Sequence, residues 1–149
     1  MARTMLLVAV LFGAFDARAE DPLQAFMHHV DAQARADMNG FYATVSAQFG
    51  VPEVQVRAVV GKVHDPADAF MIFQIGHMSG QPLDRVFPVY ESHKKQGWGA
   101  MAKELGIKPG SPEFHALKNG DLTYGPGGGK SRGKGKGKSK GKGKGKGGD

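Results

Sequence analysis

The sequence predicts an all-α fold: a small bundle of five or six short helices with a disordered basic C-terminal tail. Apolar residues recur three and four positions apart through residues 41–120, which is the periodicity of helices that bury one face. A Gly-x-Pro pattern at 50–52, 80–82 and 110–112 fits helices that end at a glycine and restart at a proline. Between the two terminal segments lie about 105 residues, enough for one modest core.

Residues 1–19 are expected to form a signal peptide that is cleaved after Ala19. Arg3 gives the start of the chain a positive charge, residues 5–15 form an uncharged apolar run, and residues 17–19 form an A-x-A pattern. A membrane span needs about 20 apolar residues, so a cleaved signal is favoured over an anchor. The mature protein is therefore expected to be periplasmic or secreted, and not membrane-spanning after cleavage.

Residues 20–40 form an N-terminal segment whose structure the sequence determines poorly. Apolar and polar residues alternate from Val30 to Met38, which is the periodicity of a strand. The alanine, glutamine and arginine residues of the same stretch favour a helix. We therefore expect a helix here, with a strand as the alternative.

The first clear helix ends at Gly50, because glycine often terminates helices. Its apolar residues lie four positions apart and form one stripe: Phe41, Val45 and Phe49. Pro52 then suits the first position of the next helix. Five valines between residues 54 and 63 also suit a strand, but four of them follow helical spacing: Val56, Val59, Val60 and Val63.

The next helix has the clearest start in the chain. Asp65 suits the N-cap, Pro66 the first helical position, and Asp68 the first turn, where an acid is stabilised. Residues 67–78 are apolar nearly all round, which is typical of the buried central helix of a bundle. Gly80 is expected to end this helix.

Two further helices are expected between Pro82 and Gly106. The first has apolar residues at i, i+3, i+4 and i+7: Leu83, Val86, Phe87 and Tyr90. Pro88 lies inside it and should kink it, because proline cannot donate the backbone hydrogen bond. The second helix repeats this spacing: Trp98, Met101, Ala102 and Leu105. A last short helix is expected between Ser111, which would cap it, and Gly120.

The segment that begins at Gly97 contains GWGAMAKELGIKPGSPEFHALKNG, and residues 65–69 and 79–82 read DPADA and SGQP. Together they resemble a group of small uncharacterised exported bacterial proteins, which have a GWGxxAxxLGIxPGS-like helical segment and a Gly/Lys-rich tail. The resemblance covers residues 41–146, roughly, and implies export and a helical fold. It assigns no catalytic or binding residue, since no activity is established for that group.

The formal net charge of +6 is divided unevenly along the chain. The body, residues 20–125, has nine Lys and Arg against twelve Asp and Glu, a charge of −3. Residues 126–149 have nine Lys and Arg against one Asp, a charge of +8. Binding to a polyanion is therefore expected of the tail and not of the body.

The tail, expected to be disordered over residues 121–149, is a low-complexity Gly/Lys-rich segment. From Arg132 to Lys146 a cation occupies every second position, with Gly or Ser between. Glycine disfavours a stable helix and repulsion between lysines extends the chain, so such a segment can follow an irregular polyanion. The candidate polyanion-binding residues are Lys130, Arg132, Lys134, Lys136, Lys138, Lys140, Lys142, Lys144 and Lys146.

These features predict a non-enzymatic periplasmic or secreted protein whose tail binds anionic envelope polymers, such as lipopolysaccharide or acidic glycans. The alternative is a nucleic-acid-binding protein whose Lys/Gly tail makes the phosphate contacts. If the protein is exported, extracellular nucleic acid is the corresponding partner. A third class of partner is another envelope protein. Residues 79–107 also suit a helix-turn-helix, but the second helix has only Lys103 as a cation, and the core needs its apolar face.

No catalytic, metal-binding or cofactor-binding residue is assigned. The absence of cysteine excludes disulfides and thiol chemistry. Two groups combine histidine with methionine, which suits copper: Met27-His28-His29 and His77-Met78. Neither group has a further histidine at ligand spacing. Ser111, Glu113 and His115 would point in different directions around a helix, so they do not form a catalytic trio.

Overall fold

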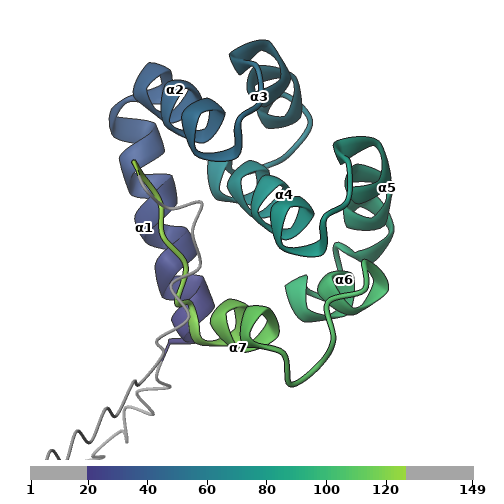
Figure 1. Cartoon of the computed structure of the whole chain (residues 1–149). Coiled ribbons are helices and arrows are strands. Elements are labelled where there is room, and N and C mark those ends of the chain that lie inside the picture. Colours follow the sequence, from purple (N-terminus) through teal and green to yellow (C-terminus); the bar gives the residue numbers. More distant parts are fainter. Residues whose placement is uncertain (1–19, 127–149) are drawn as a thin grey trace, which may run out of the picture.

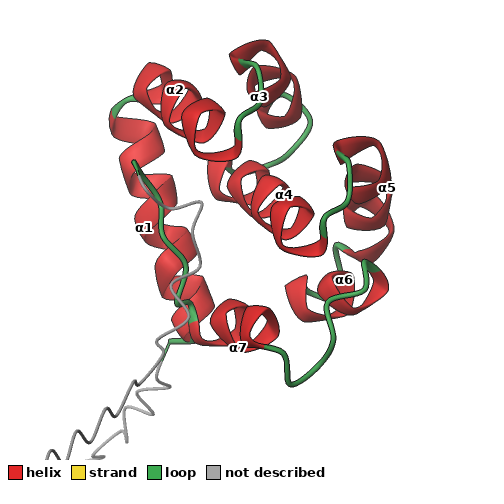
Figure 2. Cartoon of the chain, viewed as in Figure 1, coloured by secondary structure: helices red, strands yellow, loops and turns green. Residues whose placement is uncertain are grey.

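The computed structural model describes residues 20–126. The expected signal peptide and the nine candidate cations of the tail lie outside these residues. Within the described range every element is a helix, which confirms the all-α prediction (Figure 2). The seven helices are α1 (Pro22–Ala36), α2 (Met38–Phe49), α3 (Glu53–Val60), α4 (Pro66–Ser79), α5 (Leu83–His93), α6 (Trp98–Glu104) and α7 (Pro112–Asn119). This is one helix more than the upper expectation, because the poorly determined N-terminal segment forms α1.

Asp37 divides this N-terminal segment into two helices. It terminates α1, and its side chain caps α2 by accepting the Gly40 N–H at 2.9 Å. The strand-like alternation lies in a helix because Val30 and Ala34, one turn apart, are both fully buried. Gly40 has no room for a side chain, since a Cβ there would meet the Asp37 carboxylate. The helical body therefore starts at α1 and not at residue 41.

The centre of the bundle is α4, as the sequence predicted from its apolar surface. It contacts α1 and α2 on one side and α3 and α5 on the other (Figure 1). Nine of its fourteen residues are buried. α7 lies against the start of α1 and against α6, so the last of the described helices closes the bundle onto the first.

The glycine and proline signals set most helix boundaries as expected. Gly50, Gly80 and Gly120 end α2, α4 and α7 with φ near +65°. Pro52 and Pro82 are N-caps and not first helical residues, because their extended ψ angles of 141° and 156° place them just before the helices. α5 is one continuous helix through Pro88.

Residues 121–125 pack on the body, so the disordered tail predicted from residue 121 was assigned too early. Tyr124 stacks on Phe41 with ring centroids 5.9 Å apart. The Gln48 side chain donates to the Thr123 carbonyl at 2.8 Å and accepts the Gly125 N–H at 3.0 Å. This segment runs beside α1 in Figure 1. No helix among residues 20–126 is both long and apolar enough to cross a membrane.

Candidate functional site

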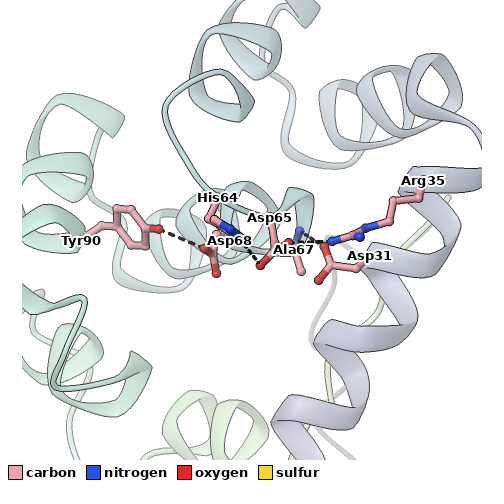
Figure 3. A network of polar contacts seen from close by, with 7 residues as sticks. All are labelled: Asp31, Arg35, His64, Asp65, Ala67, Asp68 and Tyr90. Atoms are coloured by element: carbon pink, nitrogen blue, oxygen red, sulfur yellow. Dashed lines mark hydrogen bonds and ion pairs between the residues drawn. The ribbon is translucent and has the colours of Figure 1, made fainter.

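A line of polar contacts crosses the N-terminus of α4 and joins it to α1 and α5 (Figure 3). Asp65 is the N-cap residue of α4, as predicted, but its side chain makes no capping hydrogen bond. Its carboxylate instead accepts from Arg35 at 2.7 Å and contacts His64 Nδ1 at 2.9 Å. The cap is supplied from α1, where Asp31 Oδ1 accepts the Ala67 N–H at 2.7 Å. A carboxylate distant in sequence thus satisfies one of the orphan N–H groups of α4.

The three carboxylates at this helix start have different electrostatic environments. Burial raises the pKa of Asp31 and of Asp68, and the negative charge of Asp65 raises both further. The hydrogen bond from His64 is the main cause that lowers the pKa of Asp65, and the same bond raises the pKa of His64. Asp68 is therefore a partly buried carboxylate in surroundings that already carry negative charge.

Asp68 is connected to α5 through Tyr90. The Tyr90 hydroxyl donates to Asp68 Oδ2 at 3.0 Å, and the Tyr90 side chain is otherwise buried. Burial, followed by the nearby Asp68 charge, raises the pKa of Tyr90. The tyrosine therefore stays protonated and keeps its hydroxyl as a donor to the carboxylate.

A pocket of about 290 Å³ opens beside this pair, between the start of α4, the end of α5 and the start of α6. Trp98 stacks on Tyr90 with ring centroids 5.6 Å apart and an angle of 22°. Lys94 Nζ lies 5.2 Å from the centroid of the Tyr90 ring and 2.8 Å from Glu91 Oε1. His64, His93, Gly97 and Met101 complete the polar and apolar lining. The pocket thus combines a carboxylate, an ammonium group and two stacked aromatic rings.

The residues singled out in the sequence take other places. Ser111 caps α7 by accepting the Phe114 N–H at 3.2 Å, as predicted. His28 lies 3.5 Å from Glu20, His29 contacts Gln33, and the His77 ring lies 6.0 Å from that of Phe49. Within residues 20–126 no group of three or more His, Cys, Asp or Glu side chains could hold a metal ion. The nine tail cations are beyond the described residues, so the structure does not place them.

The sequence did not predict this pocket, because each of its main residues already fitted an ordinary role in a helix. Asp68 suited the first turn of a helix, and Tyr90 and Trp98 suited apolar stripes, so none of them stood out as a binding residue.

No protein-family model matches this chain, and no curated protein or solved structure matches it either. The functional interpretation therefore rests on the residues of the chain itself.

Replacing Asp31 with asparagine should change how stability depends on pH. The raised pKa of Asp31 means that the folded protein binds this proton more tightly than the unfolded chain. The contribution of Asp31 to stability is therefore lost as the pH rises from about 4 through the folded-state pKa. Asparagine cannot ionise but still offers an oxygen to the Ala67 N–H, so Asp31→Asn should gain stability relative to wild type over this pH interval. Urea denaturation at pH 4 to 7 measures the difference.

The control is Asp31→Ala, which removes the cap at every pH. It should cost about 1 kcal/mol, the usual value for a lost N-cap. Parallel stability profiles for wild type and Asp31→Asn from pH 4 to 7 would contradict the prediction.

Proposed function

We propose that this chain is an exported, non-enzymatic protein whose basic C-terminal segment binds anionic envelope polymers. The observation that carries the proposal is the division of charge, −3 in residues 20–125 against +8 in residues 126–149. The folded helical body would then be the part that is held in place. Lipopolysaccharide phosphates and acidic glycans are the polymers with the required charge.

The spacing of the cations supports a loose and adaptable mode of binding. In an extended chain, residues two positions apart lie about 6.6 Å from one another, at ~3.3 Å per residue. Each cation near an anionic surface contributes about 1 kcal/mol, and salt weakens this contribution. The segment contains no aromatic residue, so stacking on bases is not its mode of binding.

The cations of the body support the same assignment, because three of the nine already lie beside carboxylates. Arg35 lies 2.7 Å from Asp65, and Lys94 lies 2.8 Å from Glu91. Arg57 is 3.5 Å from Glu53. The body therefore presents less unopposed positive charge than its count of cations indicates, and the C-terminal segment is the better candidate for a polyanion.

Neutralising the C-terminal segment is expected to abolish retention on immobilised lipopolysaccharide. The variant replaces the nine cations with glutamine, which keeps the length and changes only the charge. Wild type should be retained and should elute at raised salt, whereas the glutamine variant should bind at least tenfold more weakly and pass through without retention. A chain that ends at residue 126 should behave like the glutamine variant, and it keeps Tyr124 and the other described residues that pack on the body. Equal retention of all three proteins, with equal salt dependence, would refute the proposal.

Nucleic-acid binding by the same cations is the alternative, and it also predicts salt sensitivity. On duplex DNA, log K should fall with log[salt] with a slope of about −0.9 per phosphate neutralised. Location separates the two functions. A mature protein that starts at Glu20 in the cell envelope would favour envelope polymers, whereas an intact chain in the cytoplasm would favour nucleic acid.

A further inference from the structure

The pocket beside Tyr90 carries opposite charges around a single ring, and this arrangement is independent of the C-terminal segment. Asp68 Oδ2 accepts from the hydroxyl of Tyr90 at 3.0 Å. Lys94 Nζ lies 5.2 Å from the centre of the same ring. Both side chains line the pocket. A small molecule that enters there can therefore meet a carboxylate and an ammonium group at once.

The carboxylate side of the pocket is suited to a cation. An ionised carboxylate accepts hydrogen bonds through both of its oxygens, and the bond from Tyr90 uses only Oδ2. The charges of Asp31 and Asp65 add negative potential at Asp68. A primary ammonium group would supply donors and would offset the cost of burying this charge.

The ammonium side is suited to an anion. Lys94 makes an ion pair with Glu91, but both side chains are about half exposed, and such pairs contribute only ~0–1 kcal/mol. An ammonium group has three donors, so Lys94 can bind a carboxylate in the pocket as well. The histidine side chains are less suited to this task. His93 Nδ1 lies 3.0 Å from the Val89 carbonyl oxygen, and His64 contacts Asp65.

The remaining lining is apolar and the space is small. Trp98 is partly buried and Met101 is almost fully buried, and they lie on the α6 side of the pocket. A volume of about 290 Å³ corresponds to roughly ten water molecules, at ~30 Å³ each. A free amino acid with a medium apolar side chain occupies less volume than this, so it fits in the pocket.

We propose that this pocket binds a free α-amino acid, with its ammonium group on Asp68, its carboxylate on Lys94 and its apolar side chain against Trp98 and Met101. The two charges of such a ligand are adjacent, and the site also places its two charges against one ring, with Asp68 at the hydroxyl of Tyr90 and Lys94 near the ring centre. An amine or a carboxylic acid alone would satisfy only half of the site.

Fluorescence titration of the full-length chain tests this proposal, because Trp98 is the single tryptophan of the sequence. The probes are L-leucine, N-acetyl-L-leucine, which lacks the ammonium group, and L-leucinamide, which lacks the carboxylate. L-Leucine should give a saturable change, and each modified probe should bind at least tenfold more weakly. No saturable change with L-leucine, or equal affinity for all three probes, would overturn the proposal.

Two variants assign the charges to their partners. Asp68→Asn should weaken the binding of L-leucine about tenfold, and it should then bind L-leucine and N-acetyl-L-leucine with equal affinity. Lys94→Met should bind L-leucine and L-leucinamide with equal affinity. Asp84→Asn and Lys95→Met alter exposed residues outside the pocket and should bind like wild type. Unchanged discrimination in Asp68→Asn and Lys94→Met would overturn the assignment, and the three probes on wild type decide the proposal even if a variant fails to fold.

Discussion

Replacing Phe70 with alanine is expected to lower the free energy of unfolding by about 3–5 kcal/mol. Phe70 has no exposed surface and lies in α4, at the centre of the bundle. Its ring lies 5.5 Å from both Phe26 and Phe49, and 5.8 Å from Tyr124. These three rings come from α1, α2 and the C-terminal end of the body. One truncation therefore opens a cavity where three separate parts of the chain meet.

Urea denaturation followed by circular dichroism measures this loss. Val54→Ala is the matched control, since Val54 is 74% exposed and its truncation should change stability by no more than about 0.5 kcal/mol. A similar small change for both variants would show that the rings around Phe70 do not form the main core.

The sequence predicted the helices well where the signal is local. Gly50 and Gly80 end helices because a glycine adopts positive φ without a steric penalty, and this requirement is visible in the sequence itself. The apolar surface of α4 predicted its central position for a similar reason, because a helix that is apolar all round must be covered on all sides. Both inferences depend only on neighbouring residues.

The errors occurred where distant residues decide the structure. Aspartate is a favoured residue at an N-cap, but Arg35 and His64 bind the Asp65 carboxylate. Asp31 makes the capping hydrogen bond in its place. Arg35 lies thirty positions away. No local pattern shows such a pairing, so the position was predicted and the bond was not.

The same reason explains the C-terminal boundary and the pocket. Residues 121–126 have no helical or strand periodicity, and the contact of Tyr124 with Phe41 and Phe70 depends on the packing of α2 and α4. Asp68 and Tyr90 are separated by 22 positions and belong to different helices. Each looked like an ordinary helix residue, and only the packing of α4 against α5 makes them a pair.

Replacing Gly120 with alanine is expected to lower the free energy of unfolding by about 2–5 kcal/mol. Gly120 ends α7 with φ +64°, a conformation that costs an L residue about 1–2 kcal/mol. Its surroundings add a second cost. An added Cβ would lie 2.8 Å from the Pro22 carbonyl carbon, closer still to its oxygen, and 3.2 Å from the Leu23 nitrogen. These are backbone atoms at the start of α1 and cannot rotate away, so the two helices must separate, at about 1–3 kcal/mol.

Gly50→Ala separates these two costs. Gly50 has nearly the same φ, +65°, but no atom lies within 4 Å of the position of its Cβ. Gly50→Ala should therefore lose only the conformational cost, about 1–2 kcal/mol. The difference between the two variants in urea denaturation then measures how closely α7 is held against α1. Equal losses at both glycines would mean that this contact does not restrain the helices, and that α7 closes the bundle without fixing the start of α1.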